Sequence, residues 1–282
     1  MMSRIHAEEL HIHYGHNKII KGIDLDIPDK KVTAIIGSNG CGKSTLLKAM
    51  TRIIPYQQGA VIFDGKMISR ENTKQLARKM AILPQSQESA SGLTVRELIS
   101  YGRFPYQKGM GKMTKRDKEA IQWAMDVTNT HAFQYHPVDA LSGGQRQRVW
   151  IAMALAQETD IIFLDEPTTY LDMAHQLEVL ELLDRLNKEQ ERTIIMVLHD
   201  LNQAARFADY MVALKDGEII QTGVAGDVMT PEVLKKVFHI DALIGKDPRT
   251  GQPICISYNL IKGDQSHEKE SDAYPSAVDA VH

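Results

Sequence analysis

The stretch from Gly37 to Thr45, GSNGCGKST, constrains this chain more than any other feature of its sequence. It fits the pattern G-x-x-x-x-G-K-[ST], in which Lys43 is the cation and Ser44 is the hydroxyl. The residues before it, KVTAII, predict a buried strand, and STLLKAMTRI after it predicts a helix that is stopped by Pro55. A strand, a glycine-rich loop and a helix in this order predict a site for nucleotide phosphates.

The residue types in this loop suit a triphosphate. Without β-carbons at Gly37, Gly40 and Gly42, the backbone N–H groups can approach phosphate oxygens, and the following helix points its positive end at the same place. Lys43 can bridge the β- and γ-phosphates, and Ser44 can take one position on an octahedral Mg²⁺. A chance match in a glycine-rich turn is the alternative, and the flanking strand and helix argue against it.

Composition and charge limit the class of protein further. At 282 residues the chain has room for one large α/β domain with a subdomain, or for two small domains. Its two cysteines, Cys41 and Cys255, argue against a disulfide framework, and nothing near Cys41 predicts a reactive or metal-bound thiol. A net charge of −3 gives no basic footprint for nucleic acid. We therefore expect no nucleic-acid partner and a reducing, cytosolic compartment.

Neither the start of the chain nor its hydropathy predicts a segment that enters a membrane. The opening residues, MMSRIHAEELHIHYG, carry charges and lack the apolar run of a signal peptide. No segment approaches the roughly 18 consecutive apolar residues that are needed to span a bilayer. We therefore expect that any link to a membrane goes through a partner protein.

Strand and helix signals along the chain predict an α/β core with additions. The segment up to Lys30 alternates apolar and polar residues, which predicts antiparallel strands, and Asp64-Gly65 and Asp216-Gly217 are hairpin turn signals. From about residue 90 the pattern becomes helical, which predicts a helical subdomain over about 90–157, inserted in the core. The tail at 262–282 is polar and aperiodic, and we expect it to be disordered.

Two carboxylates close the apolar run DIIFLDEP, which extends from Asp160 to Pro167. This pattern is typical of a parallel strand that is buried on both faces and carries its chemistry at the carboxyl end. Asp165 is placed to hold Mg²⁺, usually through its water, and Glu166 can polarise the attacking water. A solvated acidic strand end is the alternative, and the upstream phosphate loop favours the functional interpretation.

Two further motifs predict groups near the phosphates. TIIMVLHD predicts another buried strand, and its terminal His199 faces the same edge of the sheet, where it can donate a hydrogen bond to the γ-phosphate. LSGGQ, from Leu141 to Gln145, opens a helix and forms a second anion-binding terminus that has no lysine of its own. An ordinary helix cap is the alternative, and the motif by itself favours that cap.

The complete set of motifs is specific. In chain order, the phosphate loop, Gln85, LSGGQ, DEP, TYLD and His199 resemble those of the ATP-binding subunit of ABC transporters, and the resemblance covers the chain up to about Ile261. It implies an ABC ATPase domain over residues 1–261, with a P-loop NTPase α/β core, an antiparallel β subdomain and an inserted α-helical subdomain. It also implies ATP and Mg²⁺ as ligands. A P-loop kinase is disfavoured, because LSGGQ and His199 have no role in one.

The resemblance implies a role for each motif residue. By position alone, Tyr14 either stacks on a purine or caps the sheet, and it matches the aromatic residue that stacks on adenine. Glu166 matches the catalytic base, His199 matches the switch histidine, and Gln85 matches the residue that links the metal and the attacking water to the helical subdomain. The expected magnesium ligands are Ser44, Gln85 and Asp165, and the expected ATP contacts are Tyr14, Gly37, Ser38, Asn39, Gly40, Cys41, Gly42, Lys43, Ser44, Thr45, Ser142, Gly143, Gly144, Gln145 and Asp172.

The resemblance also implies partners. In this family the Ser-Gly-Gly helix start of one subunit closes over the γ-phosphate held by the other, so we expect a homodimer, in which Asp172 matches the loop that meets the partner subunit. Hydrolysis would reopen the dimer and move an integral membrane permease. A substrate-binding lipoprotein or periplasmic protein would take part indirectly, and the chain would lie peripherally on the cytoplasmic face of the membrane.

Two short sequence segments narrow the expected class of transporter. GRFPYQ, from Gly102 to Gln107, and TTYLDMAHQLEVL resemble the importer branch that serves iron-siderophore, haem and cobalamin uptake. Siderophore import is the first expectation, and haem or cobalamin import is the alternative. A soluble ABC protein that acts on ribosomes or DNA usually has two nucleotide domains or a long coiled coil, whereas this chain has one LSGGQ and no sustained heptad run.

Overall fold

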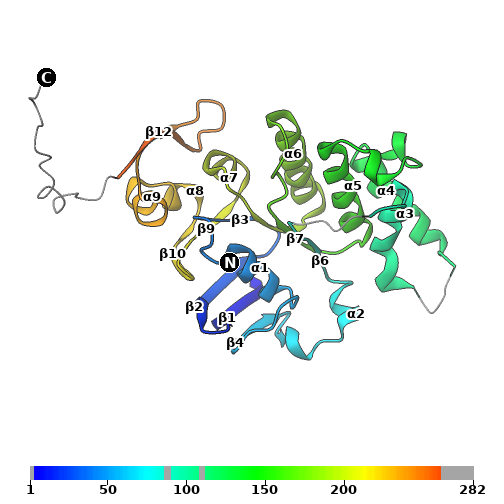
Figure 1. Cartoon of the computed structure of the whole chain (residues 1–282), viewed down its shortest axis with the longest axis horizontal. Helices are drawn as coiled ribbons and strands as arrows, with labels where there is room; N and C mark the ends of the chain where they lie inside the picture. Colours follow the sequence, from blue (N-terminus) through cyan, green and yellow to red (C-terminus); the bar gives the residue numbers. More distant parts are fainter. Residues whose placement is uncertain (1–2, 86–89, 108–111, 262–282) are drawn as a thin grey trace, which may run out of the picture.

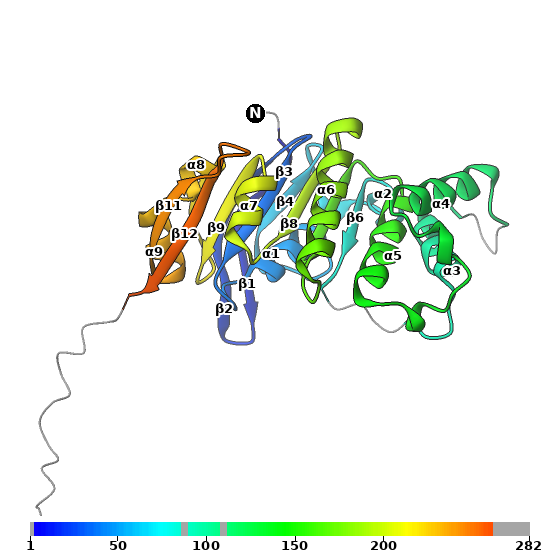
Figure 2. The ribbon, with the colours of Figure 1, turned by 90° about the horizontal axis from the view of Figure 1, so that it is seen from above.

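The computed structural model describes residues 3–85, 90–107 and 112–261, so the tail expected at 262–282 lies outside the described residues. The centre of the molecule is a six-stranded sheet in the order β10-β9-β3-β8-β7-β6 (Figures 1 and 2). Its strands are β3 (Val32–Gly37), β6 (Met80–Leu83), β7 (Ile161–Asp165), β8 (Thr193–Val197), β9 (Tyr210–Lys215) and β10 (Glu218–Gly223). All neighbouring pairs are parallel except β10 with β9, which places an antiparallel strand at one edge.

The central strands are buried on both faces because each face meets a separate hydrophobic core. Ile35 of β3 and Val197 of β8 face one core, whereas Ala34 of β3 and Met196 of β8 face the other. Side chains alternate along a strand, so a strand that is covered on both sides needs an uninterrupted apolar run. This requirement explains the continuous apolar stretches before the phosphate loop and before DEP.

An antiparallel sheet and helix α1 (Lys43–Met50) pack against the first of these cores (Figure 1). The strands are β1 (Ser3–Tyr14), β2 (Asn17–Pro28), β4 (Gln58–Phe63) and β5 (Lys66–Met67), in the order β2-β1-β4-β5. The expected hairpin at Asp64-Gly65 joins β4 to β5, and both turn residues have positive φ angles, 49° and 73°. A two-residue turn with two positive φ angles matches the twist of the strands that it connects.

A block of helices follows β6 and precedes β7 in the chain, and it forms one end of the molecule (Figures 1 and 2). Its members are α3 (Val95–Ser100), η2 (Tyr101–Tyr106), α4 (Lys115–Val127), η3 (His131–Phe133), η4 (Val138–Ala140) and α5 (Gly143–Ala156). Helices α3, α4 and α5 each begin with a reciprocal capping box, which fixes where the helix starts. The predicted fold class is confirmed, and the domain bounds of about 90–157 and 1–261 stay a prediction.

Two short elements, η1 (Ile68–Arg70) and α2 (Thr73–Leu76), contribute Ile68 and Leu76 to the first core. The remaining elements cover the second core and the other end of the molecule (Figure 2). They are α6 (Met173–Gln190), α7 (Leu201–Phe207), α8 (Ala225–Val228), α9 (Pro231–Phe238), β11 (Ile240–Lys246) and β12 (Pro253–Leu260). Strands β11 and β12 form a separate antiparallel pair. Among the described helices, none combines the length and the apolar character that crossing a bilayer requires.

Candidate active site

The phosphate loop connects the buried strand β3 to α1, and its glycines are required for two different reasons. Gly42 precedes the helix with φ of 106°, and a β-carbon there would lie 2.8 Å from Ile20 Cδ1. Gly40 has φ of 78° and open space where its β-carbon would be. Positive φ angles favour glycine at both positions, and the open space beside Gly40 leaves its backbone free to face a ligand.

A pocket of about 470 Å³ lies over this loop, where the central strands end. Nine of the predicted site residues line it, namely Asn39, Gly40, Gly42, Lys43, Ser44, Thr45, Gln85, Glu166 and His199. Three lining residues were not predicted: Ile19, Thr169 and Tyr170. Parallel strands direct their carboxyl ends to one edge of a sheet, so β3, β7 and β8 bring together motifs that are more than a hundred residues apart in the sequence.

Lys43 is almost fully buried, and its ammonium group folds back onto the loop. Its Nζ donates to the carbonyl oxygens of Gly37 and Ser38, at 2.9 and 3.0 Å. These contacts keep the charge at the mouth of the loop, within reach of a phosphate bound there. Gly37 and Ser38 therefore act here through their backbone, and neither lines the pocket.

Ser44 and Asp165 form the pair expected for a magnesium ion. Ser44 Oγ donates to Asp165 Oδ1 at 2.7 Å, and Asp165 Oδ2 is buried without a hydrogen-bond partner among the described residues. Burial raises the pKa of the Asp165 carboxyl, and the hydrogen bond from Ser44 opposes that shift. A hydroxyl and a carboxylate with an unpaired oxygen are ligand types that Mg²⁺ prefers, so these residues fit the ion.

Glu166 is held from three sides at the edge of the pocket. Its Oε1 lies 2.6 Å from His199 Nε2, and its Oε2 accepts hydrogen bonds from Gln85 Nε2 at 2.6 Å and from Thr169 Oγ1 at 3.1 Å. The Glu166 side chain is only 9% exposed, and its backbone is left-handed, with φ of 55°. A strained backbone at a site residue is a common sign of a functional constraint. The predicted base, switch histidine and glutamine therefore meet in one cluster.

Thr169 is the residue of this cluster that the sequence analysis missed. It lies three positions after Glu166, and Thr169 N donates to the Glu166 carbonyl oxygen at 3.3 Å. This turn returns the threonine hydroxyl to the carboxylate that it follows. Two threonines, Thr168 and Thr169, follow the D-E-P string, and only the turn geometry makes the second of them a partner of Glu166.

The LSGGQ motif caps helix α5 and does not line the phosphate-loop pocket of its own chain. Ser142 Oγ accepts from Gln145 N at 3.3 Å, and Gln145 Oε1 accepts from Ser142 N at 3.1 Å. The sequence allowed this motif to be a helix cap or an anion-binding terminus. The two functions are compatible with each other, because a capped helix start still presents N–H groups to an anion. The contacts of Ser142, Gly143, Gly144 and Gln145 with ATP stay a prediction.

Asp172 caps helix α6 and is not part of the pocket. Its Oδ1 accepts from His175 N at 2.9 Å and lies 2.8 Å from His175 Nδ1. Hydrogen bonds from the His175 backbone and side chain lower the pKa of the Asp172 carboxyl. Its predicted place at a subunit contact is not visible in one chain and stays a prediction.

Two other predicted contacts lie away from the pocket lining. Tyr14 ends β1 at the tip of the β1–β2 hairpin, and 53% of its surface is exposed. The Cys41 side chain is buried in the core behind the loop, and burial raises the pKa of its thiol. The side chain of Cys41 therefore packs in the core, and both the ATP contact of Cys41 and adenine stacking on Tyr14 stay predictions.

Comparisons with known proteins agree with this geometry. A family model described as ABC transporter matches residues 20–169. The chain is 57% identical to the iron(3+)-hydroxamate import ATP-binding protein FhuC of Bacillus subtilis (strain 168), over 94% of this chain and 98% of that protein. It is 42% identical to the ferric enterobactin transport ATP-binding protein FepC of Escherichia coli (strain K12), over 90% of this chain and 94% of that protein.

A solved structure is also similar across most of the described fold. It is the dimeric post-hydrolysis state of the ATP-binding cassette MJ0796, bound to ADP and Pi. The TM-score is 0.70 at 28% identity, and the match covers 78% of this chain and 98% of that chain.

Proposed function

This chain belongs to the ABC transporter family, and we propose that it is the ATP-hydrolysing subunit of an importer that takes up iron–siderophore complexes. Two relatives with import or transport functions for ferric siderophores are similar over nearly their whole length. The relative at 57% identity is an iron(3+)-hydroxamate import ATP-binding protein, so hydroxamate siderophores are the cargo class that we expect first. Haem and cobalamin are the alternative cargoes.

The single observation that supports catalysis most strongly is the convergence of three donors on Glu166. Gln85 and Thr169 fix one carboxylate oxygen, and His199 lies against the other. In this arrangement Glu166 is the general base that takes the proton of the attacking water, and the fixed carboxylate has little freedom to lose in the transition state. With ATP bound, His199 would exchange its contact with Glu166 for a hydrogen bond to the γ-phosphate, and Lys43 would neutralise charge on the β- and γ-phosphates.

Magnesium has a defined place in this proposal. Ser44, Asp165 and Gln85 would hold the ion, which neutralises charge on the phosphate oxygens when it is bound. Asp165 Oδ2 accepts no hydrogen bond from a described residue and would gain a partner in the ion, because a buried carboxylate oxygen without a partner is costly. Tyr14 would stack on adenine at the open side of the loop.

A second copy of the chain would complete each nucleotide site. The MJ0796 cassette is dimeric with nucleotide bound, and in this chain Ser142 and Asp172 lie outside the phosphate-loop pocket. In a two-fold dimer, Ser142 to Gln145 of each copy would close over the nucleotide of the other, and Asp172 would meet the partner. ATP would hold the dimer closed, and loss of phosphate would let it reopen.

A membrane permease and a substrate-binding protein complete the proposed importer. None of the described helices could cross a membrane. In the proposed importer, an integral membrane permease moves the cargo. We place the chain on the cytoplasmic face of the membrane, where its helical block would transmit closure of the dimer to the permease. A lipoprotein or periplasmic protein would deliver the cargo without touching this chain.

Catalysis is tested by the variant Glu166→Gln, with exposed Glu119→Gln as the matched control. We expect Glu166→Gln to bind ATP normally and to release phosphate at least about 100-fold more slowly, because it keeps the shape of the side chain and removes the base. Glu119→Gln should match the wild type in both assays. Wild-type turnover by Glu166→Gln would contradict the assignment of the base.

Cargo is tested in cells that lack this gene. We expect uptake of iron-loaded hydroxamate siderophores to be lost, and to be restored by the wild type but not by Glu166→Gln. Catecholate siderophores, haem and cobalamin are the comparison cargoes. Loss of haem or cobalamin uptake alone would overturn siderophore import as the function. In a pull-down from solubilised membranes, recovery of the protein with ribosomes instead of a polytopic membrane protein would overturn a function in transport.

A further inference from the structure

The start of helix α6 carries two adjacent side chains, His175 and Gln176, that contact two different neighbouring helices. His175 lies against the start of α5, and Gln176 is hydrogen-bonded to α7. The first neighbour carries LSGGQ, and the second begins at Leu201, two residues after His199. Neither His175 nor Gln176 lines the phosphate-loop pocket, so contact with a nucleotide in this chain does not explain them.

The contact between His175 and α5 accounts for one of the two glycines in LSGGQ. A β-carbon on Gly144 would lie 2.8 Å from His175 Cδ2 and 2.9 Å from Cγ, closer than real side chains approach. At Gly143 the nearest atom to such a β-carbon is the Tyr170 carbonyl oxygen, at 3.8 Å, which is an ordinary contact. Gly144 is therefore needed because the imidazole ring occupies the space of a side chain.

Backbone conformation does not provide another reason for glycine at position 144. Gly143 and Gly144 are the first residues of helix α5, and neither is among the described glycines that have a positive φ. Any residue can adopt that helical conformation. Space beside the His175 ring is thus the structural constraint on Gly144.

The ring of His175 is held in this position by Asp172. Asp172 Oδ1 lies 2.8 Å from His175 Nδ1 and also accepts from the His175 backbone N–H at 2.9 Å. A side chain that is fixed at one ring nitrogen has little rotational freedom. The TYLD loop, the imidazole ring and the start of α5 therefore form one packed unit.

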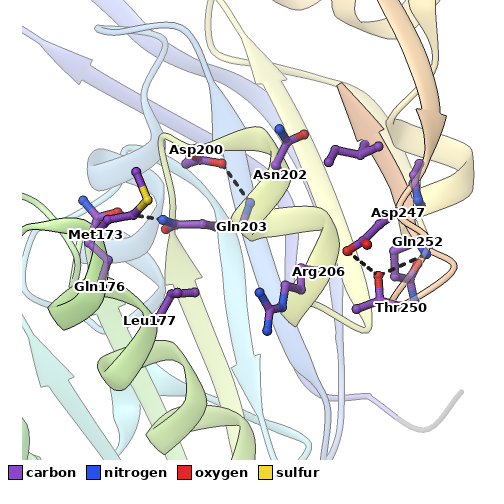
Figure 3. Close-up of a pocket in the computed structure, with 12 residues that line it drawn as sticks. Met173, Gln176, Leu177, Asp200, Asn202, Gln203, Arg206, Asp247, Thr250 and Gln252 are labelled. Atoms are coloured by element: carbon purple, nitrogen blue, oxygen red, sulfur yellow. Dashed lines mark hydrogen bonds between the residues drawn. The ribbon is translucent and has the colours of Figure 1, made fainter. Parts of the chain in front are cut away.

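Gln176, which follows His175, connects this unit to helix α7, and Figure 3 shows its contact with Gln203. Its Nε2 donates to the Leu171 carbonyl oxygen at 3.0 Å, and its Oε1 accepts from Gln203 Nε2 at 2.6 Å. Gln203 N in turn donates to Asp200 Oδ1 at 2.8 Å, and Asp200 directly follows His199. A continuous set of contacts thus leads from Gly144 to the residue beside His199.

We propose that His175 and Gln176 form a bridge that ties the start of α5 to the start of α7, with His175 as a positioning residue for Gly144 and its helix. This inference rests on the proposed function, because Ser142 and His199 serve different nucleotides only in the ATP-bound dimer. In each copy, the LSGGQ helix start faces the partner's nucleotide, and His199 faces the copy's own nucleotide. The bridge then fixes the position of the first relative to the second. Closure at one site is thereby coupled to geometry at the other.

A double-mutant cycle on Gly144 and His175 tests the contact. Gly144→Ala alone should lower the ATPase kcat by about tenfold and lower the melting temperature, because the methyl group displaces the ring. His175→Ala alone should lower kcat about threefold. In the double variant the methyl group has room, so we expect the melting temperature to return to that of His175→Ala; kcat is not used for this comparison, because Gly144 is itself a predicted ATP contact. A double variant whose loss in melting temperature equals the sum of the single losses would overturn the bridge.

A second measurement separates positioning from a general loss of stability. In a Glu166→Gln background, His175→Ala should weaken ATP-dependent dimer formation about tenfold and leave ATP affinity of the monomer unchanged, since His175 lies outside the pocket. His131→Ala is the matched control, because His131 also pairs with a residue three positions away, Gln134, at 2.9 Å, in the helical block. Equal dimerisation of the His175→Ala and His131→Ala proteins would also overturn the bridge.

The two proposals fail in different ways. A wild-type protein that binds ATP without hydrolysing it would overturn the proposed function. An active wild type with additive Gly144 and His175 effects would overturn only the bridge. His175→Asn keeps a side-chain donor near Asp172 with less bulk. If Asp172 holds the ring in position, this variant should dimerise better than His175→Ala. Equally poor dimerisation of the two variants would count against the role of Asp172.

Discussion

At the scale of single residues, Asp165 is a buried carboxylate of the described site with only one of its two oxygens hydrogen-bonded to a described residue. It is 1% exposed, one oxygen accepts from Ser44, and the other has no partner among the described residues. Burial raises the pKa of its carboxyl above the ordinary value of 3.8. Because the unfolded chain releases this proton at a lower pH than the folded chain, the free energy of unfolding falls as pH rises between the two pKa values.

This argument predicts the behaviour of Asp165→Asn. Without nucleotide, the variant should melt at a higher temperature than the wild type near pH 7, and the difference should shrink as the pH falls towards about 4. With saturating Mg-ATP the order should reverse, because only the wild type gains the full binding energy of the ion. Differential scanning fluorimetry across pH measures both effects. A pH-independent difference, or the same difference for the exposed control Asp160→Asn, would contradict the assignment.

At the scale of elements, Arg103 joins three parts of the helical block. It is 1% exposed, and it donates to Asp117 of α4 at 2.8 Å, to Glu158 at 2.7 Å and to the carbonyl oxygen of Ala156 at 2.7 Å. Its guanidinium lies 4.0 Å from the centre of the Tyr106 ring. The string GRFPYQ, in which the sequence analysis found a resemblance to one importer branch, therefore has a definite packing function.

Removing this arginine should loosen the helical block. We expect Arg103→Ala to lower the free energy of unfolding by about 3–5 kcal/mol, because it leaves the Asp117 carboxylate buried without its partner. Arg103→Lys should lose most of the same stability, since an ammonium cannot reproduce the fork of donors. Urea denaturation measures the loss, and Lys115→Ala, at a side chain that is 93% exposed, is the control. Wild-type stability of Arg103→Lys would contradict this account.

At the scale of the whole molecule, the described chain forms only half of each proposed nucleotide site. We expect Glu166→Gln with Mg-ATP to have twice the monomer mass of 31.7 kDa by light scattering, and the nucleotide-free protein to be monomeric. Adding Ser142→Arg should abolish the dimer, because a long side chain would enter the space needed for the partner's nucleotide. Ser69→Arg, at an exposed position of η1, is the control. A dimer that persists with Ser142→Arg would contradict the composite site.

The sequence by itself determined the α/β core and most of the residues around the phosphate-loop pocket. The glycine loop, the apolar strands and the polar residues that end those strands are local patterns, and parallel strands bring their carboxyl ends to one edge whatever the connecting segments contain. Lys43, Ser44, Glu166 and His199 could therefore be placed together before any coordinates were known.

Only the tertiary structure decided which side chains pack between elements. The ring of His175 on Gly144 and the partners of Arg103 follow from how helices lie against one another, and a turn that no sequence pattern announced returns Thr169 to Glu166. Such contacts depend on the distance and rotation between elements that are separated in sequence, as Arg103 and Glu158 are. Local periodicity fixes which face of a helix is buried, but it does not specify which residue of another element that face will meet.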